Sequence, residues 1–181
     1  MRNLVTTAAL AFASIVLWLH SRRRDVDPAT QGISHYAVGR THGAMTVAFL
    51  ALAVSLIGAA RVIESAEIVW LRVAAVSLVL VAVLPVSFNR SSPRRDLAHT
   101  IAALAFFLSV AIGAVLASAG AHRAVLTAAW FVASGVVVFL VSMTRLPVLW
   151  SVRGWLQRAC FSFVVIWLLL TGACDASTGL F

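Results

Sequence analysis

Charged residues are scarce in this 181-residue chain, and six long stretches contain none. Only 11% of the residues are charged, whereas 62% are hydrophobic. The uncharged stretches are residues 3–20, 43–60, 73–89, 100–122, 124–144 and 159–174. Each is close to the ~20 apolar residues that a helix needs to cross ~30 Å of hydrocarbon. So little polar surface excludes a soluble globular domain of ordinary composition.

The chain also lacks ionisable residues in the middle of its apolar stretches and lacks a pair of cysteines that could bond to each other. No Asp, Glu, Lys, Arg or His lies in the middle of an apolar stretch, which argues against a charge-coupled transporter. The chain has two cysteines, Cys160 and Cys174, fourteen residues apart on one expected helix. That spacing separates them by roughly 21 Å, whereas Cα atoms joined by a disulfide lie within ~7 Å. They cannot pair with each other, so cysteine gives no indication of the redox compartment.

The pattern predicts an all-helical, polytopic membrane protein with six transmembrane helices. We expect the spans at about 3–20, 43–61, 68–86, 98–119, 124–144 and 155–174, in a single domain of residues 1–181. Small residues at a spacing of four predict close helix contacts. They are Ala51, Ser55 and Ala59 in the second span and Ser109, Gly113 and Ala117 in the fourth, with Ser134 and Gly135 in the fifth.

All fourteen basic residues are arginine, and most of them flank the apolar stretches. Ten lie in the connections after spans one, three and five, and four lie on the other side. The positive-inside rule therefore predicts a multi-pass protein of the cytoplasmic membrane with both termini outside. More charge follows the first stretch than precedes it, which indicates a retained anchor rather than a cleaved signal. We therefore attribute the net charge of +8 to arginines that set the topology and contact anionic lipid, and we expect no nucleic-acid partner.

The polar residues capable of binding or chemistry gather in the three arginine-rich connections. The first contains Ser34-His35-Tyr36-Ala37-Val38-Gly39 and then Arg40 and His42. The second has a turn at Pro85 and then Asp96 and His99, and the third reads Gly154-Trp155-Leu156-Gln157-Arg158. Because all three connections lie on one side of the membrane, a shared site at that face is geometrically possible.

These motifs, in this order, resemble the bacterial membrane family catalogued as domain of unknown function 998. The resemblance extends from about residue 27 to the last span and implies the same multi-span architecture, without implying an established activity. The family usually has Gly-Pro where this chain has Gly39-Arg40. It commonly has an acidic residue after the proline turn, where this chain has Val86-Ser87.

Two functions remain open at this stage. A metal-dependent lipid hydrolase could use His35, His42, Asp96 and His99 as zinc ligands. However, the chain lacks the paired H-x-x-x-H histidines of multi-span lipid amidases, and Arg94 and Arg95 beside Asp96 oppose a cation. We therefore expect no zinc site, no cofactor and no catalytic residue.

The favoured interpretation is a non-enzymatic, lipid-associated or accessory protein that binds an anionic headgroup at the cytoplasmic face. Membrane lipids, anionic phospholipid among them, are the expected partners, and a second copy or another membrane protein is left open. The residues predicted to meet at this end of the bundle are Ser34, Tyr36, Gly39, Arg40, His99, Gln157 and Arg158.

Overall fold

The structure is a computed structural model that describes residues 1–63, 68–86, 92–144 and 146–174. Its α-helices are α1 (Arg2–Arg22), α2 (His42–Val62), α3 (Ile68–Val83), α4 (Pro93–Ala117), α5 (Arg123–Ser142), α6 (Pro147–Ser151) and α7 (Arg153–Ala173). Two short 3₁₀ helices, η1 (Ile33–Ala37) and η2 (Gly39–Thr41), lie between α1 and α2. The predicted all-helical class is confirmed for the described ranges.

Five of these helices, α1, α2, α4, α5 and α7, are long and apolar enough to cross a membrane. The sixth, α3, is also apolar but has 16 described residues and is shorter. It ends at Val83, as expected from Pro85, because proline disfavours helical backbone in the residue before it. The six-helix architecture predicted from the sequence is therefore consistent with the structure.

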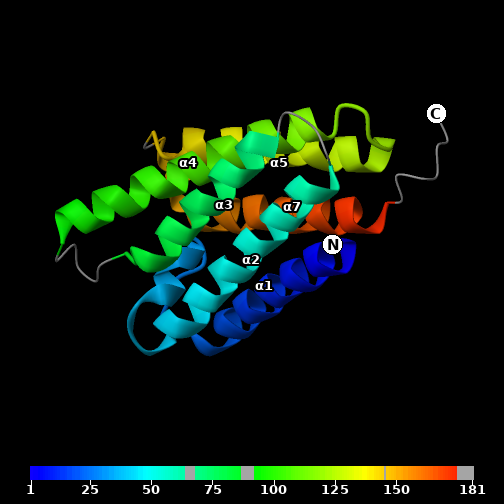
Figure 1. The fold of residues 1–181 in the computed structure, drawn as a ribbon. Coiled ribbons are helices and arrows are strands. Elements are labelled where there is room, and N and C mark those ends of the chain that lie inside the picture. Colours follow the sequence, from blue (N-terminus) through cyan, green and yellow to red (C-terminus); the bar gives the residue numbers. More distant parts are fainter. Residues whose placement is uncertain (64–67, 87–91, 145, 175–181) are drawn as a thin grey trace.

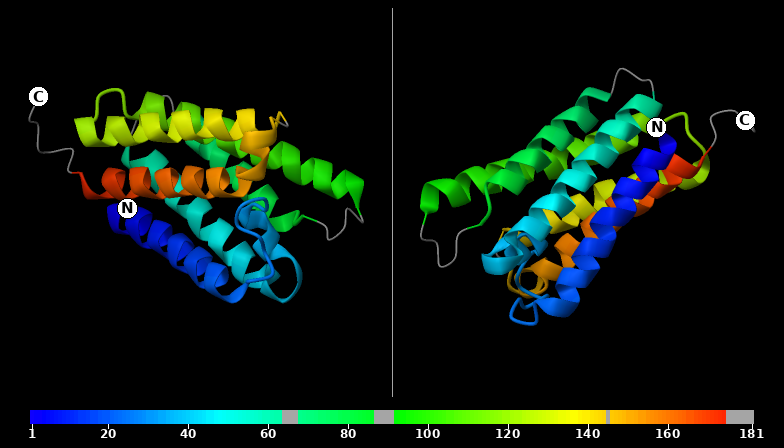
Figure 2. Two further views of the ribbon diagram at one scale, coloured as in Figure 1. Left: turned by 180° about the vertical axis from the view of Figure 1, so that it is seen from behind. Right: turned by 60° about the horizontal axis from the view of Figure 1, so that its bottom comes forward.

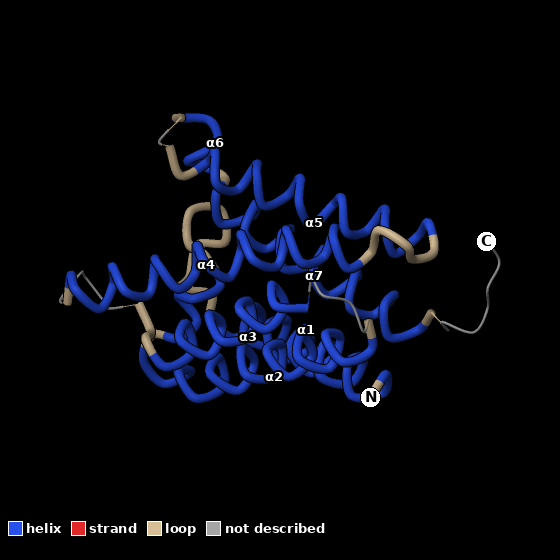
Figure 3. Tube along the Cα trace, turned by 45° about the horizontal axis from the view of Figure 1, so that its top comes forward, coloured by secondary structure: helices blue, strands red, loops and turns tan. Residues whose placement is uncertain are grey.

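The long helices run up and down, each packed beside the next in the chain (Figure 1). The last helix, α7, returns to lie between α5 and α1, which closes the bundle (Figure 2). Both α1 and α7 therefore place their outer ends, near the two termini, at the same end of the molecule. The opposite end carries the α1–α2 connection, α6 and the start of α4, which projects beyond its neighbours (Figure 3).

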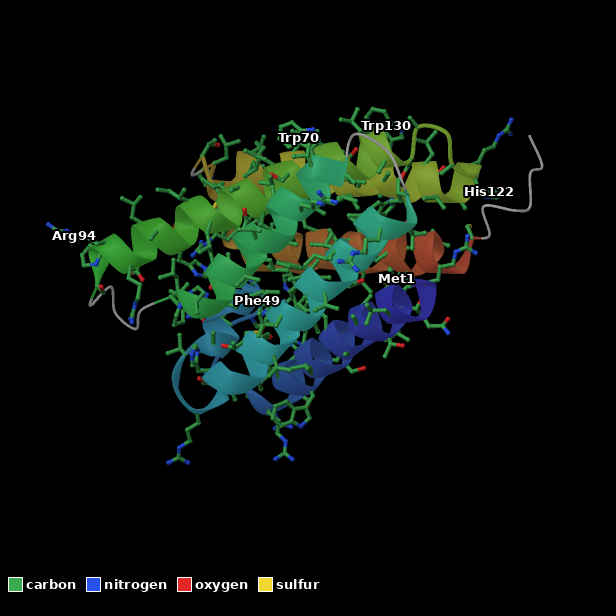
Figure 4. The ribbon with its side chains drawn as sticks, viewed as in Figure 1. Met1, Phe49, Trp70, Arg94, His122 and Trp130 are labelled. Atoms are coloured by element: carbon green, nitrogen blue, oxygen red, sulfur yellow. The ribbon has the colours of Figure 1, made fainter. Side chains whose placement is uncertain are left out.

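Five phenylalanine side chains fill the centre of the bundle. Phe161 of α7 stacks on Phe106 with a centroid separation of 5.4 Å and meets Phe107 edge-on at 5.3 Å. Phe12 and Phe49 contact the same ring from α1 and α2, at 5.5 and 6.3 Å. Phe49 is visible near the middle of the molecule in Figure 4. Phe161 therefore joins α1, α2, α4 and α7 through aromatic contacts.

Glycines bring neighbouring helices close together. A Cβ atom on Gly113 would lie 2.8 Å from Leu71 Cδ2, and one on Gly58 would lie 2.9 Å from Val5 Cγ2. Gly135 likewise faces Phe163, but Ser134, which we expected at the same contact, is exposed. Successive helical residues are ~100° apart around the axis, and here Gly135 faces α7 whereas Ser134 is turned to the surface. The small-residue prediction holds for Gly113 and Gly135 and was wrong for Ser134.

The helix of the fourth span, α4, begins at Pro93, before the expected start of the span near residue 98. Proline suits the first helical position, and Asp96 in the first turn is favoured by the helix dipole. His99 consequently lies more than one turn inside α4 and is buried, instead of opening the span. A second proline, Pro147, starts the short helix α6, which the sequence analysis did not predict.

A folded connection and a polar cavity at the arginine-rich end

The connection between α1 and α2, residues 23–41, folds back onto the ends of the helices. Its segment η1 packs against α1, α2 and α7. Ile33, Tyr36 and Ala37 are buried among these helices, so this part of the connection belongs to the hydrophobic core. The connection is drawn in blue and cyan beside the lower ends of α1 and α2 in Figure 1.

The side chain of Arg158 in α7 holds this connection by hydrogen bonds to the backbone of the connection. Its Nη1 donates to the carbonyl oxygens of Pro28 and Gln31 at 2.9 and 2.7 Å. The same nitrogen lies 3.0 Å from the carbonyl of Gly154, one turn earlier in α7. Nη2 donates to the hydroxyl of Tyr36 at 2.8 Å. The guanidinium thus joins segments about 130 residues apart in the sequence.

The Tyr36 hydroxyl also contacts a second partner, His20 of α1. The Oη atom lies 2.7 Å from His20 Nδ1. Because Arg158 can only donate, Oη accepts from it, and the phenolic hydrogen is available for His20. The shared hydroxyl therefore links the last turn of α1 to η1 and, through Arg158, to α7.

Gln157 and Gly154 make two further attachments from α7. Gln157 Oε1 accepts from the backbone N–H of Ile33 at 2.8 Å. The backbone N–H of Gly154, free at the start of the helix, donates to the carbonyl of Ala29 at 2.7 Å. A Cβ on Gly154 would lie 2.5–2.9 Å from three carbonyl oxygens of the connection, so only glycine permits this approach.

Arg23 organises the other side of the connection. Its Nη1 donates to the carbonyl of Val38 at 2.7 Å and to Thr41 Oγ1 at 2.5 Å. Its Nε and Nη2 hold the carboxylate of Asp25 with two bonds of 2.7 Å each. Hydrogen bonding to Arg23 is the main reason that the pKa of Asp25 lies below its ordinary value.

A small cavity lies beneath η1 and above the phenylalanine cluster. Its volume is about 10 Å³. Ser34, His99 and Gln157 line it together with Phe49, Phe106, Phe107 and Phe161 and other apolar side chains. Ser34 and His99 are only 8% and 6% exposed. His99 Nδ1 lies 2.6 Å from the carbonyl oxygen of Leu84, just beyond the end of α3, so Nδ1 carries the ring hydrogen.

His35 is half-buried beside this cavity. Its Nδ1 is enclosed, and no described residue forms a hydrogen bond with it. Burial is the main cause that lowers the pKa of His35, and the charges of Arg153, His99 and Arg158 act in the same direction. The carbonyl of Gly32 opposes them only in part. The His35 ring is therefore neutral at neutral pH.

The structure brings five of the seven predicted site residues together. Tyr36, Gln157 and Arg158 meet through the hydrogen bonds described above, and Ser34 and His99 share the cavity with Gln157. Gly39 supports a turn with φ of +77°, a conformation that glycine adopts readily. Arg40 is exposed in η2 and takes no part in the hydrogen bonds of this cluster. Arg90 and Arg145, expected at the same end, lie outside the described residues.

The four proposed zinc ligands do not assemble. His42 is exposed at the start of α2, away from the buried His99. Across the described ranges, no three His, Cys, Asp or Glu side chains are grouped so that they could hold a metal ion. The arrangement does not supply the ligand set that the hydrolase alternative needs.

Sequence reasoning missed His20, Arg23 and Thr41. Arg23 lies between Arg22 and Arg24, and nothing in the run distinguishes the arginine that binds the connection from the two that are exposed. His20 and Tyr36 are sixteen residues apart, across a connection whose path the sequence does not reveal. The only signal was the concentration of polar residues between spans one and two.

Comparison with known families gives one match. The model of the family described as "Protein of unknown function (DUF998)" matches residues 6–173. The chain belongs to this family. The matched range covers the described long helices, apart from the first four residues of α1, and every residue of the hydrogen-bonded cluster, which confirms the resemblance seen in the motifs. Searches of the curated proteins and of the solved structures gave no match.

Proposed function

We propose that this DUF998 protein is a non-catalytic membrane protein that binds anionic phospholipid headgroups at its arginine-rich end. The observation that carries the proposal is a division among the arginines of that end. Arg23 and Arg158 are bonded to the protein's own connection. Arg22, Arg24, Arg40, Arg94 and Arg95 are exposed. The first pair builds the surface, and the second group is available to a partner.

The exposed arginines have surroundings suited to a lipid surface. Trp18 and Trp155 are 48% and 49% exposed, close to Arg22 and to the start of α7. Tryptophan favours the headgroup level of a membrane, where its ring is apolar and its N–H remains hydrated. In Figure 4, Arg94 extends from the projecting end of α4, away from the bundle. Guanidinium groups bind phosphate with two parallel hydrogen bonds, which suits a phospholipid.

The proposal includes an orientation. If the arginine-rich end faces the cytoplasm, its arginines meet the anionic inner leaflet and both termini lie outside. Reporter fusions at the C-terminus and in the α3–α4 connection test this directly. If a reporter that works only in the cytoplasm is active when fused to the C-terminus, the orientation is the opposite of the one proposed.

The binding test compares two triple variants with matched charge changes. In one, Arg22, Arg24 and Arg40 become Gln; in the other, the exposed Arg61 and Arg123 and the opposite-end Arg2 become Gln. An arginine near an anionic surface contributes about 1 kcal/mol, so the first variant should lose roughly 100-fold in affinity. Native mass spectrometry with phosphatidylglycerol and phosphatidylcholine gives the retention of each lipid. Equal retention by both triple variants would refute a site at this end.

A further inference from the structure

The cavity beneath η1 has the size and the polar lining of a hydration site. A volume of about 10 Å³ is close to the smallest that holds one water molecule. It is far too small for a headgroup, a sugar or any drug-sized ligand. The exposed arginines take no part in its lining.

The polar groups around the cavity have unused hydrogen-bonding capacity. Ser34 is 8% exposed, and its hydroxyl forms no hydrogen bond with a described residue. The Nδ1–H of His99 is taken by the Leu84 carbonyl, so the lone pair of Nε2 is the group that His99 retains. Gln157 uses its carbonyl oxygen for the Ile33 N–H and retains an NH₂ group with two donors.

Leaving these groups without partners in so apolar a place would be costly. A buried hydroxyl or ring nitrogen without a hydrogen bond costs ~1–3 kcal/mol, and the cavity floor is formed by phenylalanine rings. Buried waters typically make about three hydrogen bonds to such groups. Ser34, His99 and Gln157 offer that number, with both donors and an acceptor among them.

We propose that this cavity binds one ordered water molecule that bridges the Ser34 hydroxyl, His99 Nε2 and the Gln157 amide. The water donates to His99 Nε2 and accepts from the Gln157 NH₂ group. The Ser34 hydroxyl can rotate to form the third hydrogen bond with the water. It extends a chain of hydrogen bonds from the connection through His99 to the Leu84 carbonyl. This links η1 to α3 and α4, whereas Arg158 links the same connection to α7. The site is independent of the proposed lipid binding.

Solid-state NMR in lipid bilayers tests the proposal on the wild-type cavity, and a substitution is needed only to assign the signals. Uniform ¹⁵N-histidine labelling, assigned with a His99→Gln variant, should show His99 as the Nδ1–H tautomer. Magnetisation should pass from a slowly exchanging water to this ring. A His99 ring in that tautomer with no transfer from water means a dry cavity and overturns the proposal.

A double-mutant cycle provides a second readout. Ser34 and His99 form no direct hydrogen bond, so a water that bridges them requires their substitutions to be coupled. Ser34→Ala should change the unfolding equilibrium several-fold in the wild type and much less in His99→Phe. Ser55→Ala is the control, because Ser55 bonds the Val5 carbonyl between α1 and α2, and its effect should be the same in both backgrounds. Additive effects for Ser34 and His99 would contradict the bridge.

Discussion

In the α1–α2 connection, side chains of Arg23 and Arg158 hold backbone carbonyls, whereas at the centre of the bundle aromatic rings pack against one another. The difference follows from the surroundings of each region. Within hydrocarbon, helices gain little from burying apolar surface, so shape and close contact decide their association. An irregular connection has carbonyls without helical partners, and these must be satisfied by side chains or water. The arginines of one end therefore build structure as well as set topology.

The largest effect should come from the aromatic centre. Phe161→Ala removes a ring that contacts phenylalanines on three other helices, and truncation of a buried phenylalanine costs about 3–5 kcal/mol. Unfolding in mixed micelles by increasing denaturing detergent measures the loss. Phe131→Ala is the control, because Phe131 is 55% exposed and should cost little. Equal losses from the two variants would mean that the central cluster does not hold the bundle.

The next effect should come from Arg158→Ala. It removes the donor to Pro28, Gln31 and Tyr36 together and should cost roughly 2–4 kcal/mol. Lysine should not restore the loss, because a single ammonium cannot reproduce the planar fork. Hydrogen exchange should increase in residues 28–38 and remain unchanged in α4 and α5. Arg24→Ala, at an exposed arginine, is the control, and protection retained after Arg158→Ala would disprove the role of this side chain.

A smaller effect is expected from Gly154→Ala. The added Cβ would lie within 2.5–2.9 Å of three carbonyl oxygens, so the connection must move away, at a cost of about 1–3 kcal/mol. Gly43→Ala is the matched control, because a Cβ there meets nothing within 4 Å and alanine favours helix. Thermal unfolding of both variants in detergent provides the comparison. A Gly154→Ala protein as stable as Gly43→Ala would show that the close approach is unimportant.

The smallest expected effect is the dependence of stability on pH. His35 has a pKa below its ordinary value of 6.5, so below that pH the unfolded chain binds the proton more readily than the folded chain. Stability therefore falls as pH decreases below about 6.5, by at most ~1.4 kcal/mol per pH unit for one group. His35→Gln should reduce this slope, and His42→Gln, at an exposed histidine, is the matched control. An unaltered slope in His35→Gln would assign the pH dependence to other groups.

The prediction of the helices from sequence succeeded for a local reason. The free energy of placing a segment in hydrocarbon is nearly a sum over its own residues, so runs without charge identify helices without any knowledge of their neighbours. The end of α3 at Val83 was also predictable locally, because Pro85 disfavours helical backbone in the residue before it. Helix α4 begins before residue 98, where the arginines mark the end of the apolar run, because a helix can continue beyond the membrane.

The apolar helices, the arginine-rich connections and the concentration of polar residues near one end all follow from the order of the amino acids. Which of these residues contact one another depends on how the helices pack. Arg158 reaches Pro28 because α7 closes the bundle beside α1, and Arg23 differs from Arg22 and Arg24 only through the path of the connection. Hydrophobicity is a property of each segment, but a hydrogen bond requires two groups within about 3 Å, and that distance exists only after the helices have packed.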